Sequence, residues 1–435
     1  MSTTRRERAI AEAKVLDLSS ADFLAREFEI WDLLREELPV ARTGHAPMAQ
    51  GVTGGWVLTR YDDVADALRR PEDFSSQIGL YPVRAWIPQA IDPPAHTGYR
   101  RLLNPWFTAE AMAKLGPHLE QYAGELLEKM LAKDEFDFVA DFADPFPTVI
   151  FCELAGFPAA DHPQIMDWKN TLMHANDGHS RGHALALAKG RALGLPFAAA
   201  GPTPEQFFQI RAAVGLEIYG YLKQLIDERR RQPADDLITK LLHAKYEAER
   251  PLTQEELEDT LFLLFMAGLD TVASVLGLIV KGFAEDPERR REFVALMEEP
   301  ERVASAIEEL VRYHAIVTMP RRATRAIGFR GETFAENEIV ALPSPAANRD
   351  PAQFERPHEL VLGRSPNRHI GFGLGPHRCL GIHLARRELR VALQAFHRRL
   401  PDYRLHPAKK PELFGGMKGV SSLWLAREHP RRPPS

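Results

Sequence analysis

The longest apolar stretch of the chain covers residues 261–280 and contains one charged residue, Asp270. Thr253 precedes this stretch and Glu256 follows three residues later, a pattern typical of a capping box at a helix N-terminus. A helix of this length could cross a bilayer, which takes about 20 apolar residues. A lone spanning helix would leave Asp270 unpaired in hydrocarbon, at high cost. The pattern therefore favours a central helix of a soluble protein, buried on all its faces. The polar pair Asp270–Thr271 would then be buried as well and would require hydrogen-bond partners or a functional role.

Periodic apolar positions predict further helices on both sides of this stretch, whereas strands are few. Helices are predicted at residues 61–70, 92–131, 145–154, 205–231, 287–296, 300–313 and 380–400, and short strands at 55–60, 326–329 and 339–342. Gly and Pro interrupt residues 177–204, which predicts a mobile lid or loop with room for one short helix.

The chain shows no fixed-period repeat and no linker long enough to separate two domains. The predicted fold class is therefore a single domain that is mainly α with small β-sheets (α+β). We expect a partly disordered N-terminal extension over residues 1–30, the folded domain over residues 31–428, and a frayed tail rich in Pro and Arg over residues 429–435.

Composition narrows the class of protein. Hydrophobic residues make up 45% of the chain and charged residues 26%, as is usual for soluble globular proteins. The formal charge of −5 gives no electrostatic case for binding nucleic acid. Only two cysteines are present, Cys152 and Cys379, which excludes a disulfide scaffold. Residues 1–14 are charged and lack the apolar core of a secretory signal, so we expect a cytoplasmic protein without a membrane anchor.

The stretch FGLGPHRCLG delivers Cys379 to the start of a long predicted helix. The helix dipole and free backbone N–H groups at that position favour a thiolate. The glycines Gly373, Gly375 and Gly381 allow a flat ligand to approach the backbone closely. A lone cysteine is most often a small buried hydrophobic residue, but the glycine spacing, His377 and the following helix argue for a metal ligand.

This stretch resembles the haem-binding loop of the cytochrome P450 family. The positions that match the pattern of the family are Phe372, Gly373, Gly375, His377, Cys379 and Gly381. The resemblance implies the P450 fold, with haem b between the long buried helix and the helix that follows the loop. It also implies that Cys379 is the axial thiolate ligand of the iron, an arrangement that favours O–O cleavage.

A second match is the pair Glu309 and Arg312, whose i,i+3 spacing places both on one helix face. Taken alone, such a pair is usually a solvated surface contact. The resemblance implies instead a buried structural network near the haem loop, with Arg364 as its third member.

Asp270 and Thr271 belong to a third match. Together with Ala267 and Gly268 they form a segment that resembles the oxygen-activation segment of the family. The resemblance implies that the small residues let a ligand lie against the backbone, that Asp270 relays protons and that Thr271 assists oxygen activation. The alternative is a threonine bonded to a carbonyl one turn earlier and an aspartate paired with a basic residue.

The family also holds the haem propionates with basic residues. His96 and Arg100 are i,i+4 on a predicted helix, and Arg321 and His377 fit two further positions. Without the resemblance, each of these residues would be interpreted as a solvated surface charge. Bidentate arginine geometry suits a carboxylate.

The match covers residues 31–425 and is closest to the soluble bacterial branch that includes camphor hydroxylase. It implies a substrate pocket lined by Arg84, Trp86, Leu263, Met266, Val317, Met319 and Met417. That lining is mostly apolar, which favours a terpenoid-like or aromatic substrate. Arg84 either turns to solvent, its stem covering apolar surface, or anchors a carboxylate or carbonyl of the substrate. Arg84, Met319 and the longer stretch over 177–204 depart from the camphor enzyme.

The chain has no room for a reductase domain beside the haem domain. The resemblance therefore implies O2 as co-substrate and electrons from a [2Fe–2S] ferredoxin with its NAD(P)H-dependent reductase. We expect the ferredoxin to dock on the Cys379 side, where a basic patch is predicted from Arg100, Arg101, Arg378, Arg386 and Arg387.

Other classes of function fit less well. A haem-thiolate carrier or gas sensor has no need of a proton relay at Asp270, and neither has a peroxide-driven enzyme. Residues 178–182 match the G-x-S-x-G pattern of an α/β hydrolase, with Ser180 as the nucleophile. That motif requires a buried strand before it, and the preceding residues do not predict one.

Overall fold

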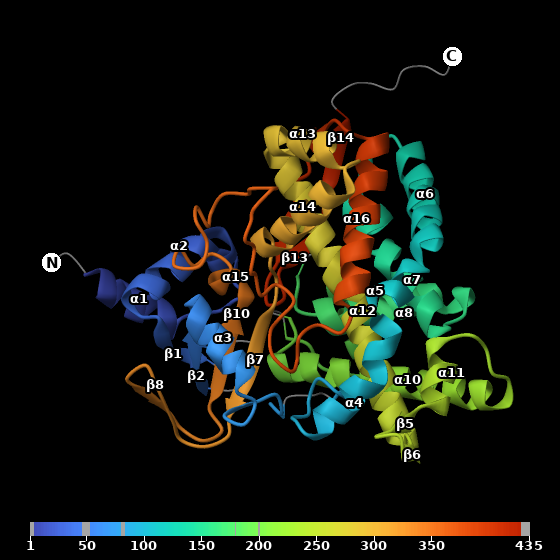
Figure 1. Cartoon of the computed structure of the whole chain (residues 1–435), viewed down its shortest axis with the longest axis horizontal. Coiled ribbons are helices and arrows are strands. Elements are labelled where there is room, and N and C mark those ends of the chain that lie inside the picture. Colours follow the sequence, from blue (N-terminus) through green and yellow to red (C-terminus); the bar gives the residue numbers. More distant parts are fainter. Residues whose placement is uncertain (1–3, 46–52, 80–82, 179, 199–200, 428–435) are drawn as a thin grey trace.

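The computed structural model describes residues 4–45, 53–79, 83–178, 180–198 and 201–427. Helices dominate and five small sheets complete the described part of the chain (Figure 1). The predicted fold class, mainly α with small β-sheets, is confirmed. The N-terminal helices and the largest sheet occupy one side of the molecule, and the helices packed around α12 occupy the other.

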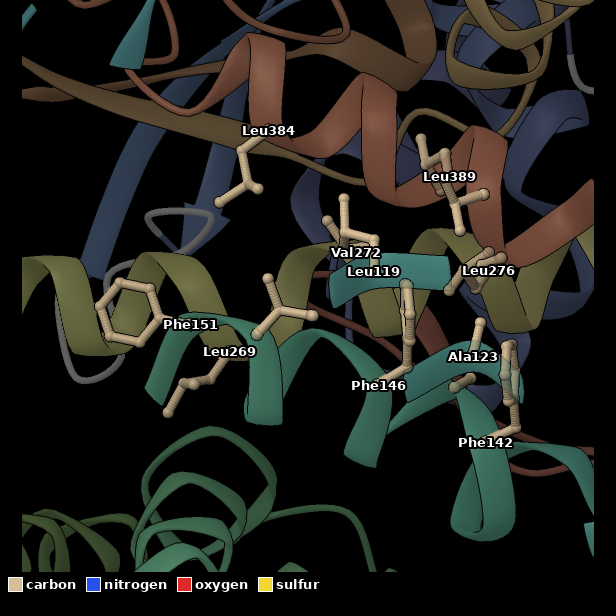
Figure 2. Packing of buried hydrophobic residues seen from close by; sticks show 14 of the residues in the cluster. Leu119, Ala123, Phe142, Phe146, Phe151, Leu269, Val272, Leu276, Leu384 and Leu389 are labelled. Atoms are coloured by element: carbon tan, nitrogen blue, oxygen red, sulfur yellow. The ribbon is translucent and has the colours of Figure 1, made fainter. Parts of the chain in front are cut away.

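The core is organised around α12 (Gln254–Glu285), which contains the long apolar stretch. Its N-terminus has the predicted capping box between Thr253 and Glu256. Figure 2 shows Val272 and Leu276 of α12 beside Leu384 and Leu389 of α16 (Ile382–Arg399), with α7 (Pro145–Ala155) on another side of α12. The helix is long and apolar enough to cross a membrane, but 78% of its most apolar window is buried within the structure. It is the core helix that the sequence favours.

The remaining helices agree closely with the periodic pattern where the pattern is strong. Both α13 (Pro287–Leu296) and α14 (Pro300–Tyr313) have the predicted bounds. The others are α3 (Tyr61–Arg69), α4 (Ala95–Leu103), α5 (Ala109–Ala113), α6 (Gly116–Ala132), α8 (His162–His174), α10 (Pro204–Arg231), α11 (Leu237–His243) and α15 (Ser344–Ala347). Short 3-10 helices cover Asn104–Phe107 and Ala159–Asp161, and a π-helix covers Val139–Ala143.

The largest sheet has the strand order β1-β2-β10-β7-β3, in which only β10 and β2 run parallel. Its strands are β1 (Val40–His45), β2 (Thr53–Leu58), β10 (Ile339–Pro343), β7 (Thr318–Ala323) and β3 (Phe74–Ser75). A second sheet joins β11 (Tyr403–Leu405), β14 (Trp424–Arg427) and β4 (Phe136–Asp137). Three hairpins are separate sheets: β5 (Lys245–Tyr246) with β6 (Arg250–Pro251), β8 (Ile327–Phe329) with β9 (Glu332–Phe334), and β12 (Glu412–Phe414) with β13 (Gly419–Ser422).

The N-terminal segment differs from the partly disordered extension expected over residues 1–30. It forms α1 (Arg5–Lys14) and α2 (Ala21–Glu37), capped by Thr4 and Ser20. Their apolar residues form a core cluster of their own with β1, β2 and β10, and Ala9, Ala13 and Phe23 are buried in it. Charged residues of the two helices form ion pairs at the surface. The tail over residues 429–435 lies outside the described residues.

The expected lid over residues 177–204 contains one helix, α9 (Arg181–Ala192), which packs against α8 and α10. The two glycines within α9 are contact points rather than helix breakers. A Cβ on Gly182 would lie 2.2 Å from the carbonyl oxygen of Asn170, and one on Gly190 would lie 2.2 Å from the ring of Phe197. Close packing of helices therefore explains the glycines that the sequence pattern assigned to a mobile loop.

Candidate functional site

The loop before α16 folds so that it presents Cys379. Gly373 and Gly375 both have a φ of 70°, a left-handed conformation that favours glycine. A Cβ on Gly375 would lie 2.3 Å from the carbonyl oxygen of Leu68, so the loop also depends on a close backbone approach there. The backbone N–H of Cys379 donates to the carbonyl oxygen of Phe372 at 2.8 Å and closes the loop.

The surroundings of the Cys379 sulfur combine burial with positive charge. Cys379 retains exposed surface, so a ligand could reach it. Burial raises the pKa of the Cys379 thiol above its ordinary value, and the backbone N–H of Gly381 and three guanidinium groups oppose the rise, those of Arg100, Arg378 and Arg386. A metal at the sulfur would reverse this balance, because a coordinated thiol is deprotonated.

A cluster of imidazole and guanidinium groups lies beside this loop. The rings of His96 and His377 are 4.0 Å apart between centroids. Burial, together with the charges of Arg100 and Arg321, lowers the pKa of His96 to about 4 and that of His377 to about 2. His96 Nδ1 and His377 Nε2 are buried and have no hydrogen-bond partner among the described residues. Unsatisfied buried nitrogens beside two guanidinium groups fit an anionic ligand that carries carboxylates.

One face of α12 retains accessible surface although the rest of the helix is enclosed. This accessible stripe has i,i+4 spacing and consists of Leu263, Ala267, Thr271 and Val275. The other faces of α12 are packed against neighbouring elements over residues 257–280, and the accessible space that the stripe faces is called the recess. Such a recess, with a cysteine loop and a carboxylate-binding cluster nearby, is what a flat prosthetic group with two propionates requires.

The small residues of α12 have different roles from each other. Ala267 lies on the accessible stripe, where a ligand could contact the backbone as expected. Gly268 has a second purpose. A Cβ on Gly268 would lie 2.4 Å from the ring of Phe151, so its missing side chain makes room for α7. Gly268 is therefore also a helix-packing glycine, and its contact with the cofactor stays a prediction.

Thr271 and Asp270 both make the bonds that the sequence alternative described, one within its own helix and the other to basic residues of α8. Thr271 Oγ1 donates to the carbonyl oxygen of Ala267 at 3.2 Å. Asp270 is 2% exposed, and its Oδ1 lies 2.8 Å from His174 Nε2 and 3.4 Å from Lys169 Nζ. The second oxygen, Oδ2, is buried without a hydrogen-bond partner among the described residues. Thr271 nevertheless remains accessible from the recess.

The partners of Asp270 extend into a buried ionic network on α8. Lys169 also pairs with Asp144, and His174 Nδ1 lies 3.0 Å from Asp177 Oδ2. Burial would raise the pKa of Asp270, but the charges of His174 and Lys169 outweigh it and hold that pKa well below its usual value. Burial would lower the pKa of His174, but the two aspartates raise it to about 9.

Sequence reasoning missed His174, Lys169, Asp177 and Asp144. Nothing local distinguishes them, because they join Asp270 only when α8 packs on α12. The one available signal was that a buried aspartate requires a basic partner somewhere in the chain.

The predicted pocket residues are only partly brought together. Leu263 lies on the accessible stripe, and Trp86 stacks on Phe262 with centroids 5.8 Å apart. Val317 and Met417 are half-buried against the main core cluster, and Met319 is half-buried beside the Cys379 loop. Met266 is 6% exposed and lies off the accessible stripe, so its assignment to the pocket is corrected to the core.

Arg84 fits neither of the two expected roles. Its Nε donates to Asp259 Oδ1 and its Nη2 to Glu258 Oε2, both at 2.7 Å. The guanidinium also lies 4.2 Å from the ring centroid of Tyr219. Arg84 is therefore not turned to solvent, and its charge is already matched by two carboxylates of α12. It ties the loop before α4 to α12 and α10.

The predicted Glu309–Arg312–Arg364 network is present and buried. Arg312 and Glu309 are both 0% exposed and form a bidentate pair at 2.7 and 2.8 Å. Arg364 Nε lies 3.0 Å from Glu309 Oε2, and the N–H of Val361 also donates to Glu309. Arg312 donates further to backbone carbonyls of the irregular stretch that leads to the Cys379 loop. The network therefore holds that stretch on α14.

Ser180 has a structural role. It is the N-cap of α9, accepting from the N–H of His183 and donating to the carbonyl oxygen of His174. It follows the end of α8 rather than a strand, so the nucleophile elbow of a hydrolase is absent at this position. The neighbouring residue 179 lies outside the described residues.

Comparison with known proteins decides the family. A family model described as Cytochrome P450 matches residues 49–414. This chain belongs to the cytochrome P450 family. It is 33% identical over 380 residues to a probable cytochrome P450 127A1 of Sinorhizobium fredii, covering 86% of this chain and 83% of that one. It is 32% identical to the polyketide biosynthesis cytochrome P450 PksS of Bacillus subtilis, covering 88% and 91%.

Solved cytochrome P450 structures share the fold over nearly the whole chain. The structure of Bacillus subtilis PksS aligns with a TM-score of 0.77 at 31% identity, covering 94% of this chain and 98% of that one. CYP109E1 from Bacillus megaterium, in complex with testosterone, aligns with a TM-score of 0.77 at 26% identity, covering 93% and 98%. The family uses haem with an axial cysteine thiolate, and named relatives are hydroxylases, so this P450 is a haem-thiolate monooxygenase.

Proposed function

We propose that this P450 hydroxylates a small, neutral, apolar molecule with O2 and electrons from an external ferredoxin. The observation that carries the proposal is the accessible stripe on α12, where Thr271 borders the recess and Asp270 stands behind it in a buried ionic network. A non-catalytic haem carrier or gas sensor would have no use for a titratable network at that position.

Cys379 is the proposed iron ligand. The other cysteine, Cys152, is 0% exposed within α7, and burial raises the pKa of its thiol to about 12. Cys379 instead borders a recess at the start of α16, where backbone N–H groups and guanidinium groups favour the thiolate. His96, Arg100, Arg321 and His377 would hold the propionates. Haem bound there supplies redox-active iron that activates O2.

Asp270 is the proposed proton relay of the reaction. Its Oδ1 is held by His174 and Lys169, which leaves Oδ2 as the carboxylate oxygen that can take up a proton and pass it on. His174 in turn contacts Asp177, whose side chain is 17% exposed, so the three groups connect the exterior to α12. Thr271 Oγ1 can exchange its bond to the Ala267 carbonyl oxygen for a bond within the recess. These groups deliver protons while the apolar surroundings limit the entry of water.

The proposed substrate is terpenoid-like or aromatic. Trp86, Leu263, Val317 and Met417 supply apolar surface, as is usual for small-ligand sites. An acidic substrate is disfavoured, because Arg84 is already engaged with Glu258 and Asp259. The relatives act on varied molecules by name, including mycinamicin IV and methyl-branched lipids, so the branch accepts different apolar skeletons.

The proposed electron donor is a [2Fe–2S] ferredoxin fed by an NAD(P)H-dependent reductase in the cytoplasm. Arg101 and Arg378 are exposed near the Cys379 loop. A cleft of about 180 Å³ lies alongside α16 and includes Arg386, Arg387 and Arg390 in its lining. Arg386 is neutralised by Glu308, which leaves the rest of this face to attract an acidic partner.

The test is a reconstituted assay with purified holoenzyme, NADH, O2, a [2Fe–2S] ferredoxin and its reductase. Ligands are first screened by the low-to-high-spin shift of the haem, using neutral terpenoids and aromatics beside matched carboxylic acids. We expect neutral ligands to shift the spin state and to yield hydroxylated product. The proposal would be contradicted if product forms only with added peroxide and not with the ferredoxin system. It would also be contradicted if no ligand that shifts the spin state yields product.

A further inference from the structure

The hairpin formed by β12 and β13 is a sheet of its own among the described residues, so no further strand fixes its position. An isolated two-stranded hairpin is marginally stable in water. Its tip carries Met417, flanked by Gly416 and Lys418. The hairpin must therefore be held by contacts outside its own ladder.

The base and the middle of the hairpin are anchored in the main core. The backbone N–H of Leu423 and the hydroxyl of Ser422 both donate to Asp137 of β4. Val420 packs near Gly277 of α12. The ring of Phe414 lies 4.5 Å from that of His174, edge to face. These contacts join the hairpin to the helix that carries Asp270 and to the partner of Asp270.

The tip is anchored elsewhere, on the segment that joins α1 to α2. The N–H of Gly416 donates to the carbonyl oxygen of Leu18 at 3.0 Å. A Cβ on Gly415 would lie 2.2 Å from that same oxygen, so the approach requires glycine. Gly416 has a φ of 80°, which again favours glycine. Two consecutive glycines thus bring the tip against the N-terminal backbone.

An ion pair completes this anchor. Lys418 Nζ pairs with Glu27 Oε2 and lies 5.0 Å from the ring centroid of Phe28. The Glu27 side chain is 4% exposed and the Lys418 side chain 21%. Removing one partner of a pair with a buried carboxylate leaves an uncompensated charge, which is costly. The pair therefore constrains the residue next to Met417.

We propose that the N-terminal segment is part of the substrate-binding apparatus, and that Glu27 and Lys418 are positioning residues that set how far Met417 extends into the pocket. The inference rests on the proposed function, in which Met417 borders the substrate. The helices α1 and α2, which lie largely in the segment that was expected to be partly disordered, would then determine which ligand shapes fit.

The first test compares two azole ligands that bind haem iron and report by an optical shift. Imidazole needs little room, whereas 4-phenylimidazole places a ring in the pocket. In Glu27→Gln we expect the Kd of 4-phenylimidazole to change by roughly fivefold or more, the equivalent of about 1 kcal/mol, while the Kd of imidazole stays within about twofold. The matched control is Glu36→Gln on the same helix, because Glu36 pairs with Arg5 at the surface.

The second test is amide hydrogen exchange, which needs no ligand. Exchange at residues 412–422 should be faster in Glu27→Gln and in Lys418→Gln, with exchange in α12 unchanged, and the double variant should add little to either single one. Lys418 is the more exposed partner, so its variant serves if Glu27→Gln fails to fold.

The outcomes separate the two proposals. Unchanged hairpin exchange, or equal changes in the Kd of both azoles, would overturn the positioning role. If the wild-type protein binds neither azole, the proposed function fails, and the exchange measurement still decides whether the N-terminal segment holds the hairpin.

Discussion

The recess has two sides that differ in how their charges are satisfied. On the side of the Cys379 loop, His96, His377 and Arg100 gather cationic and donor groups, and two buried imidazole nitrogens have no partner among the described residues. On the α12 side, Asp270 is paired with His174 and Lys169. The first side is chemically incomplete without an anionic ligand, and the second is a finished ionic network that can titrate. In the proposed function, the first side holds the cofactor and the second handles protons.

The largest expected effect comes from breaking the finished network. Asp270→Ala removes the carboxylate between His174 and Lys169, so each of these buried cations loses one of its two carboxylate partners. We expect a loss of about 3–5 kcal/mol in the free energy of unfolding, measured by denaturant titration. Thr271→Ala, which removes only a hydroxyl bonded to its own helix, should cost about 1 kcal/mol or less. Equal losses in the two variants would show that the network does not stabilise the fold.

The free energy of unfolding should depend on pH because of the same network. The pKa of His174 is raised to about 9 from an ordinary value near 6.5. A raised pKa in the folded state means that the stabilisation is fully present below about pH 6.5 and is lost as pH rises through about 9. Unfolding free energy measured across this window should therefore decline more steeply in wild type than in His174→Gln. Parallel curves would show that His174 is not charged in the folded protein.

The incomplete side should respond in the opposite direction. The pKa of His96 is lowered to about 4 and that of His377 to about 2, so both resist protonation in the folded chain. Their contribution to stability is present above about pH 6.5 and falls as pH drops toward these values. Bound propionates would relieve that loss, because a carboxylate favours the protonated imidazole. Holoenzyme should thus resist acid better than haem-depleted protein, and identical acid unfolding profiles would argue against a carboxylate at this cluster.

The strongly periodic and local features could be predicted from the sequence. The bounds of α13 and α14, the capping box of α12 and the glycine loop before Cys379 all depend on residues a few positions apart. Contacts between distant segments could not be predicted. The partners of Asp270 lie on α8, and Gly268 contacts Phe151 of α7. The charges of residues 1–30 concealed two helices whose apolar faces bury against β1, β2 and β10.

The smallest expected effect concerns Arg84, which belongs to neither side of the recess. Because Glu258 and Asp259 already match its charge, Arg84→Ala should weaken ligand binding by about 1 kcal/mol or less. The loss should be equal for a carboxylic acid and its neutral analogue, both followed by the haem spin shift. A selective loss for the acid of about 1.5–3 kcal/mol would instead make Arg84 a substrate anchor.

The identity of the iron ligand is tested most directly by the spectrum of the reduced protein with carbon monoxide. Wild type and Cys152→Ala should both show the red-shifted band that marks thiolate ligation, because Cys152 is buried within α7. Cys379→His should bind haem without that band. Persistence of the band in Cys379→His, or its loss in Cys152→Ala, would contradict the assignment of Cys379.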